Sequence, residues 1–356
     1  MPDPRISEHA RILVEYSTKV QPGDMVYIIS DLDAHPLAIE IVKLVAAKGA
    51  SPMVIMNSSE LSRGYYDAVT TKGLDLFPKH RMEAIKASDV LLSLRAPSNT
   101  RALAGVDSKH LMRRSKTTKP ISDIILNKRW CVTIHPNQAL AQEAKMSLDD
   151  YQSFVYDATL RNWEKEAKLM RKLRDKLQEN TTIRFTGEDT DLQASTNGRL
   201  WVASEGTNNM PSGEVFTSPV EQTVEGKIDF DIPFLYAGTE IAGVRLVFKN
   251  GKVVEHSADK GQGALDVLLD VDKGARYLGE MAIGTNRGIQ HYTLNMLFDE
   301  KIGDTIHCAL GNAYPECNGT NNSAVHVDII KNMKDDGRII AGDFIIYEKG
   351  KYFWEK

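Results

Sequence analysis

Cysteine is scarce in this chain. Its three cysteines, Cys131, Cys308 and Cys317, are odd in number, widely spaced and form no C-x-x-C pair. The sequence therefore predicts neither a disulfide framework nor a zinc finger. Cys308 lies beside His307, and we expect it to be a small apolar residue that faces away from that histidine on a strand.

Long apolar runs are also missing. The first residues contain no apolar core of signal-peptide length, and no later run reaches the length of a membrane-spanning helix. A surplus of positive charge is missing as well, because the formal net charge is -4. We therefore expect a cytoplasmic protein, and we predict neither nucleic acid nor a membrane as a partner.

Glycine is missing from the turn after the first predicted strand, which reads SDLDAHP over residues 30–36. Without glycine, this turn provides neither a dinucleotide-binding fingerprint nor a phosphate loop. Asp31, Asp33 and His35 are an alternative metal site. We favour a solvated turn with an aspartate near the helix cap.

The length of 356 residues favours two domains, and we place their boundary between residues 158 and 159. Residues 1–158 alternate short apolar runs with helical segments, a pattern typical of βαβ units with buried parallel strands. We expect an open, mostly parallel α/β sheet in this domain. The predicted strands are 25–29, 53–56, 90–94 and 130–134, and the predicted helices are 5–17, a segment ending at 47, and 81–87.

The pattern changes in residues 159–356. A helix over 159–178 has one apolar stripe opposite a densely charged face. Asn197-Gly198 and Asn250-Gly251 then separate strand-like runs, and Asn-Gly is a strong hairpin signal because both central residues must tolerate positive φ. We expect a mixed α+β domain rich in antiparallel hairpins.

Histidine, aspartate and tyrosine side chains gather in residues 303–330. His326 and Asp328 lie two apart in a β-branched run, so both leave the predicted strand on the same face. His307 lies in an earlier apolar run, and Tyr314 follows it. Imidazole and carboxylate together suit a divalent cation such as Zn, Co or Mn. The alternative for each histidine is a hydrogen-bonded core or surface residue.

Three glutamates occupy unusual positions. Glu214 follows a Pro-Ser-Gly turn, and Glu280 lies within an apolar run that reads as a buried strand. A buried carboxylate is costly unless it is paired or binds a metal. Arg276 is the alternative partner that would make Glu280 part of a simple salt bridge. Glu300 is either a further ligand or an ordinary acid at the end of an element, and we expect a ligand.

These residues fall within four ordered motifs: NMPSGEVF at 209–216, GARYLGE at 274–280, HCALGNAYP at 307–315 and HVD at 326–328. Together the motifs resemble the M29 family of thermophilic metallo-aminopeptidases. The resemblance implies an N-terminal α/β domain, a catalytic domain with two divalent cations (Zn, Co, Mn or Mg) and a homodimer around an enclosed cavity. The residues that match the family's site are Glu214, Glu280, Glu300, His307, His326 and Asp328 as ligands, with Tyr314 catalytic.

The expected reaction is removal of the N-terminal residue from peptides with a free α-amine, by a water that two metals activate. Glu280 is the expected bridging carboxylate, and Tyr314 is the expected donor to the oxyanion. Glu214 or Glu300 is a candidate general base. Two rival functions stay open. One is another metal-dependent hydrolase, such as an amidase or phosphoesterase, and the other is a non-catalytic protein with a structural metal site.

Overall fold

The computed structural model describes residues 3–355. The chain forms two compact units. The first runs to Arg161 and also includes Gly206–Pro211, and the second contains Asn162–Glu205 and Ser212 onward. No helix within the described range is both long enough and apolar enough to span a bilayer.

The first unit contains the predicted parallel sheet, with the order β2-β1-β3-β4-β8 and parallel pairing throughout. Its strands are β1 Met25–Asp31, β2 Ser51–Asn57, β3 Val90–Arg95, β4 Arg129–Ile134 and β8 Asn209–Met210. Its helices are α1 Pro4–Arg11, a π-helix Ile12–Ser17, a short 3-10 helix Leu32–Ala34, α2 His35–Ala47, α3 Ser59–Ala68, α4 Thr71–Leu74, α5 Lys79–Lys86, α6 Ser108–Ile125, α7 Gln138–Glu143 and α8 Leu148–Thr159.

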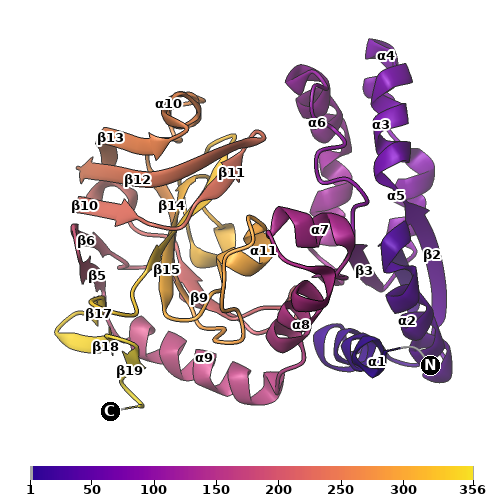
Figure 1. The fold of residues 1–356 in the computed structure, drawn as a ribbon, viewed down its shortest axis with the longest axis horizontal. Coiled ribbons are helices and arrows are strands. Elements are labelled where there is room, and N and C mark those ends of the chain that lie inside the picture. The colour runs from indigo at the N-terminus through magenta and orange to yellow at the C-terminus, as the bar shows by residue number, and fades with distance from the viewer. Residues whose placement is uncertain (1–2, 356) are drawn as a thin grey trace. The chain divides into compact units, whose positions relative to one another are not determined.

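Helices pack on both faces of this sheet because its strands are apolar on both sides. Helices α5 and α6 lie side by side (Figure 1) and share a buried cluster with one face. The cluster contains Tyr27, Met82, Ile85, Leu91 and Ile121. Val26 and Ile28 alternate with Tyr27 and are buried on the opposite face, and α2 packs against β1 and β2.

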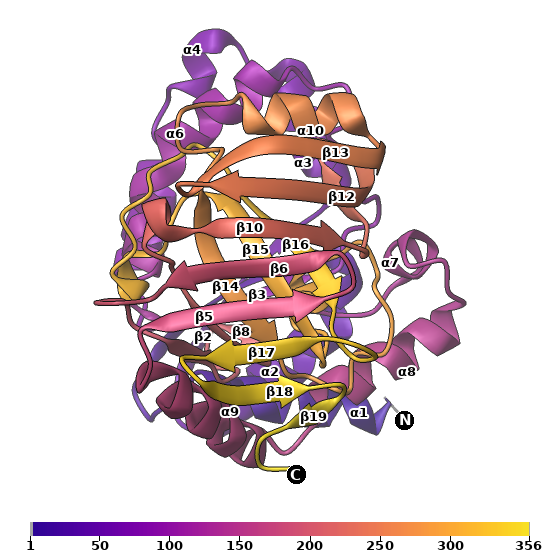
Figure 2. The ribbon, with the colours of Figure 1, turned by 90° about the vertical axis from the view of Figure 1, so that its left-hand side faces the viewer.

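The second unit contains two antiparallel sheets. The larger has the order β11-β12-β10-β6-β5-β17-β18-β19, with β13 paired to β12, and the smaller has the order β16-β15-β14-β9-β7. Figure 2 shows the larger sheet from β13 to β19, with β14 and β15 crossing behind it. Side chains from both sheets form one apolar core, to which α9 and α10 also contribute. The face of the smaller sheet opposite this core is available for polar side chains.

The elements of the second unit have the following bounds. The larger sheet contains β5 Thr182–Gly187, β6 Thr190–Ser195, β10 Glu225–Phe230, β11 Phe234–Tyr236, β12 Thr239–Lys249, β13 Lys252–Lys260, β17 Arg338–Ala341, β18 Phe344–Glu348 and β19 Lys351–Tyr352. The smaller contains β7 Val202–Ser204, β9 Glu214–Thr217, β14 Leu278–Gly284, β15 Thr305–Gly311 and β16 His326–Asn332. The helices are α9 Trp163–Gln178, α10 Gln262–Leu269, α11 Met296–Asp299 and the 3-10 helices Glu221–Thr223 and Pro315–Cys317.

The two Asn-Gly turns have different outcomes. At Asn250-Gly251 both residues have positive φ and join the antiparallel pair β12 and β13, so this hairpin prediction is confirmed. The hairpin predicted at Asn197-Gly198 is wrong, because β6 pairs with β5 and β10 whereas β7 pairs with β9 in the other sheet. After Gly198 the chain passes from the larger sheet to the smaller one. The two residues therefore form a turn, but the strands on either side of it do not pair with each other.

The predicted helix boundaries also shift. The helix expected over 5–17 changes from α to π winding after Arg11. The helix expected from residue 159 begins at Trp163, because α8 already ends at Thr159. Asn162 separates the two and caps α9 by accepting a hydrogen bond from the Lys165 backbone N–H.

Buried His9 predicts an acid sensitivity of the first unit. Its Nε2 lies 2.8 Å from the Thr133 hydroxyl, and burial, aided by the nearby His135, lowers the pKa of His9 to about 3. This pKa lies below the unfolded value of about 6.5, so the contribution to stability is complete above about pH 6.5 and declines as the pH falls toward 3. When the pH falls from about 7.5 to about 5, His9 alone should lower the free energy of unfolding by about 2 kcal/mol.

Urea unfolding of His9→Gln at these two pH values tests this sign. On acidification, the free energy of unfolding of the variant should fall by about 2 kcal/mol less than that of the natural chain, whatever the stability of the variant at neutral pH. His35→Gln, which replaces an exposed histidine, should behave like the natural chain. Equal losses in all three proteins would contradict a neutral, buried His9.

Candidate metal centre

A β-bulge in β14 turns Glu280 away from the apolar core. Leu278 pairs with Leu310, but Glu280 pairs with Ala309, so one extra residue lies between the two pairs. That residue is Gly279, where a Cβ would lie 2.2 Å from the Asn312 carbonyl oxygen. Leu278 therefore joins the core, and Glu280 appears on the opposite face although it is only two residues further on.

The other candidate ligands reach the same face by ordinary strand alternation. On β15, Ile306, Cys308 and Leu310 enter the core, which leaves His307 on the opposite face. On β16, Asp328 pairs with Ala309 and His326 pairs with Gly311, so both share the face of His307. Cys308 is buried in the core, as predicted from the strand pattern.

Five of the six predicted ligands converge on this face. Two groups of three residues have ligand atoms within 4.8 Å of one another. The first group is Glu214, Glu280 and His307, and the second is Glu280, His326 and Asp328. Glu280 belongs to both, so its two oxygens lie between the groups. All five side chains are buried or largely buried.

The spacing of these atoms fits cations better than direct hydrogen bonds. The His307 Nε2 atom lies 3.5 Å from a carboxylate oxygen of Glu214 and from one of Glu280. The His326 Nε2 atom lies 3.2 Å from Glu280 and 3.7 Å from Asp328. Ligands that bind one cation at about 2.0–2.2 Å are separated by roughly 3.3–3.6 Å in tetrahedral geometry.

An unsatisfied oxygen strengthens this fit. Asp328 Oδ1 is buried, has no hydrogen-bond partner among residues 3–355, and lies near the Nε2 atoms of both His326 and His307. Buried polar atoms are normally satisfied, so an orphaned carboxylate oxygen beside two imidazoles indicates a site for a cation. The donors are oxygen and nitrogen atoms, a set that suits Zn, Co, Mn or Mg.

The electrostatics of the cluster favour the charged forms of Glu280, His307 and His326. Burial opposes the charge of Glu280, but His307 and His326 outweigh it and lower the pKa of Glu280 to about 2. Burial likewise opposes the charge of both imidazoles, but the carboxylates raise the pKa of His307 to about 9 and that of His326 to about 10. Each imidazole must lose a proton before its Nε2 can act as a ligand.

Neighbouring groups orient this cluster, and the sequence did not identify them. The backbone carbonyl oxygen of Asn312 lies 2.7 Å from His326 Nδ1, which holds the ring so that Nε2 faces Glu280. Lys301 is fully buried and its Nζ lies 3.5 Å from Glu214. A lysine next to an acid is common in sequences, so Lys301 could not be identified from the sequence. Only its burial in the structure shows that it neutralises and positions Glu214.

Glu300 belongs to neither group of three within the described chain. Its carboxylate instead forms a close ion pair with Lys301. Burial raises the pKa of Glu300, although Lys301 opposes this effect. Arg276, the alternative partner of Glu280, pairs with Asp270 instead, so a simple Arg276–Glu280 salt bridge is wrong.

Tyr314 borders the cluster directly before the 3-10 helix Pro315–Cys317. Its ring lies against the His326 ring, with 4.7 Å between centroids, and meets Phe216 edge-on at 5.6 Å. The tyrosine is 37% exposed, whereas the ligands beneath it are mostly buried. Part of the Tyr314 side chain is therefore accessible beside the cluster, while burial and the nearby carboxylates raise the pKa of its hydroxyl.

Comparisons with known proteins agree with this chemistry. A family model described as thermophilic metalloprotease (M29) matches residues 3–352. Aminopeptidase 2 of Geobacillus stearothermophilus is 27% identical over 93% of this chain and 92% of its own. Aminopeptidase T of Thermus thermophilus is 28% identical over 90% of both chains. The solved structure of wild-type AmpT from Thermus thermophilus has the same fold, with a TM-score of 0.86 at 23% identity over 98% of this chain and 99% of that one.

Proposed function

Because this chain belongs to the M29 family of thermophilic metalloproteases, we propose that it is a metallo-aminopeptidase that removes the N-terminal residue from peptides with a free α-amine. The observation that carries this proposal is the shared position of Glu280 between two groups of candidate ligands. Peptides are the proposed substrates. The cytoplasmic location, the homodimer and the domain boundary after residue 158 stay predictions.

Two divalent cations are the proposed cofactors. Glu214, Glu280 and His307 would hold one, and Glu280, His326 and Asp328 would hold the other, with Glu300 as a predicted further ligand. When bound, a pair of cations activates water and polarises the peptide carbonyl. Zn, Co, Mn and Mg all suit this mixed donor set.

The side chains of this chain have separate tasks in the proposed reaction. Glu280 positions its two oxygens toward the two histidines, and Lys301 restrains Glu214 from the side. The Tyr314 hydroxyl donates a hydrogen bond to the oxyanion, which is the carbonyl oxygen of the substrate after water has attacked the carbonyl carbon. Glu214 or Glu300 can accept a proton if it is not fully engaged with a cation.

A matched pair of peptides tests the proposal. The chain should release leucine from a leucyl peptide but leave the N-acetylated twin intact, and excess chelator should stop the release without unfolding the protein. Cleavage of both peptides would favour an amidase, and cleavage of a phosphate ester alone would favour a phosphoesterase. Unfolding on removal of the metal, with no hydrolysis beforehand, would favour a structural metal site.

A further inference from the structure

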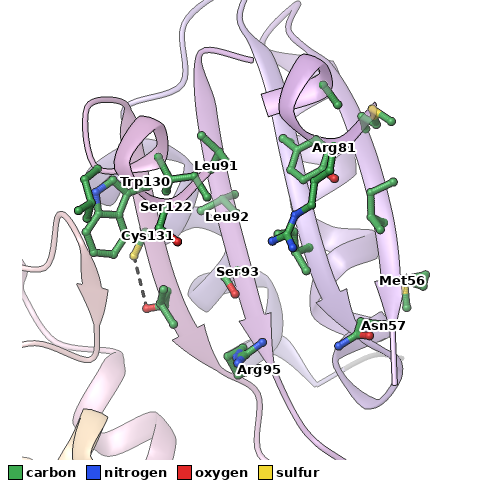
Figure 3. A pocket seen from close by; sticks show the side chains of 18 of the residues that line it. Met56, Asn57, Arg81, Leu91, Leu92, Ser93, Arg95, Ser122, Trp130 and Cys131 are labelled. Carbon is green, nitrogen blue, oxygen red and sulfur yellow. Dashed lines mark hydrogen bonds between the residues drawn. The ribbon is translucent and has the colours of Figure 1, made fainter. Parts of the chain in front are cut away.

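The first unit contains a hollow on the sheet face that α5 and α6 partly cover. Its volume is about 930 Å³. Strands β1 to β4 form the floor, and Figure 3 shows side chains from these strands and from the helix that carries Arg81 around one space. We call this space the arginine hollow, after two of its residues, Arg81 and Arg95.

Apolar side chains form most of this hollow. Tyr27, Ile29, Leu91 and Trp130 line it from the sheet. At the β2 edge, Met53 and Ile55 also line the hollow and are 50% and 38% exposed. Large apolar side chains on a sheet face are normally covered, so this part of the face can accept an apolar molecule.

The charged residues that line the hollow are two arginines, Arg81 and Arg95. Arg81 extends from α5, and Arg95 is the last residue of β3. Within residues 3–355 neither guanidinium forms an ion pair or a hydrogen bond, and no aspartate or glutamate lines the hollow. Other arginines of the same unit do have acidic partners, as Arg113 has in Asp75 and Arg129 in Asp24.

The position of the hollow in the fold also indicates a ligand. The strand order 2-1-3-4 reverses direction between β1 and β3, and open α/β sheets bind ligands beside such a reversal, at the carboxyl ends of the strands. Arg95 is at the carboxyl end of β3, and Asn57, which also lines the hollow, is at that of β2. Between β1 and β3, Asp31 accepts a hydrogen bond of 2.9 Å from the Ala96 N–H, so a negatively charged side chain already occupies this backbone donor and disfavours a phosphate there.

We propose that the arginine hollow binds a small amphipathic carboxylate that has no amino group. The guanidinium groups of Arg81 and Arg95 match a carboxylate in charge and geometry, and the apolar walls match a hydrocarbon body. An ammonium group would find no acidic partner there, so amino acids and peptides are disfavoured. This site is chemically distinct from the metal centre and does not depend on the proposed aminopeptidase reaction.

Calorimetric titration of the full chain with decanoate tests the proposal. Decanoate should bind once per chain, and Arg81→Gln and Arg95→Gln should each weaken binding at least about tenfold, as expected for loss of a charge-assisted contact. Lys79→Gln is the matched control. It removes one positive charge from the same helix, but residues two apart on a helix do not share a face.

Two further probes separate the contributions of head and body. Decanol, which lacks the charge, and leucine, which adds an ammonium group, should each bind at least about tenfold more weakly than decanoate. Absence of decanoate binding would overturn the proposal. So would equal binding by the arginine variants and Lys79→Gln, because decanoate would then be held elsewhere, for instance at the metal centre. Equal binding of leucine and decanoate would overturn the exclusion of amines.

Discussion

Glu280→Gln is expected to abolish release of the N-terminal residue. Both candidate groups share this carboxylate, so one substitution removes a charged ligand from each of them. Residues that merely orient a ligand typically change metal affinity or activity by about 10–100-fold, and a shared ligand should change it by more. Metal titration by calorimetry, together with peptide hydrolysis, measures both effects.

The fold of Glu280→Gln should survive. Glutamine has the size of glutamate, and the bulge at Gly279 depends on the backbone rather than on the carboxylate. Circular dichroism of the metal-free variant should therefore match that of the metal-free natural chain. Glu255→Gln, which replaces an exposed carboxylate on β13, should keep full activity and serves as the control. Full activity in Glu280→Gln would refute the bridging role.

Tyr314→Phe is expected to slow turnover without weakening metal binding. Phenylalanine keeps the aromatic ring that packs on His326 and Phe216, so the imidazole should stay in place. Only the hydroxyl is lost, and removal of one donor to an oxyanion typically lowers kcat by about 10²–10³-fold. The measurement is kcat and KM on a leucyl peptide at saturating metal.

A change in kcat with little change in KM would support a donor that acts in the transition state. Tyr236→Phe is the matched control, because it removes a hydroxyl from β11 in the other sheet. Its kinetics should equal those of the natural chain. If Tyr314→Phe retained full kcat, the oxyanion role would be wrong and the tyrosine would only support His326.

Local sequence patterns predicted much of the fold. Apolar runs of strand length marked β1 to β4. In β1 and β3 the reason is burial on both faces, which leaves little room for polar residues, whereas β2 is an edge strand whose Met53 and Ile55 stay exposed. Asn250-Gly251 marked a hairpin, because its positive φ angles are set within two residues. The same signal failed at Asn197-Gly198, since the choice of a strand partner depends on residues far away in the chain.

The features of the candidate metal centre likewise fall into those that the sequence predicts and those that only the structure shows. The sequence by itself identified the chemical types, the motifs and the alternation that places His326 and Asp328 on one face, because these are properties of neighbouring residues. Only the tertiary structure decided that Gly279 turns Glu280 to that face, that Lys301 is buried beside Glu214, and that Arg81 and Arg95 share a hollow. Those outcomes depend on contacts between distant segments, which form only when the sheets assemble.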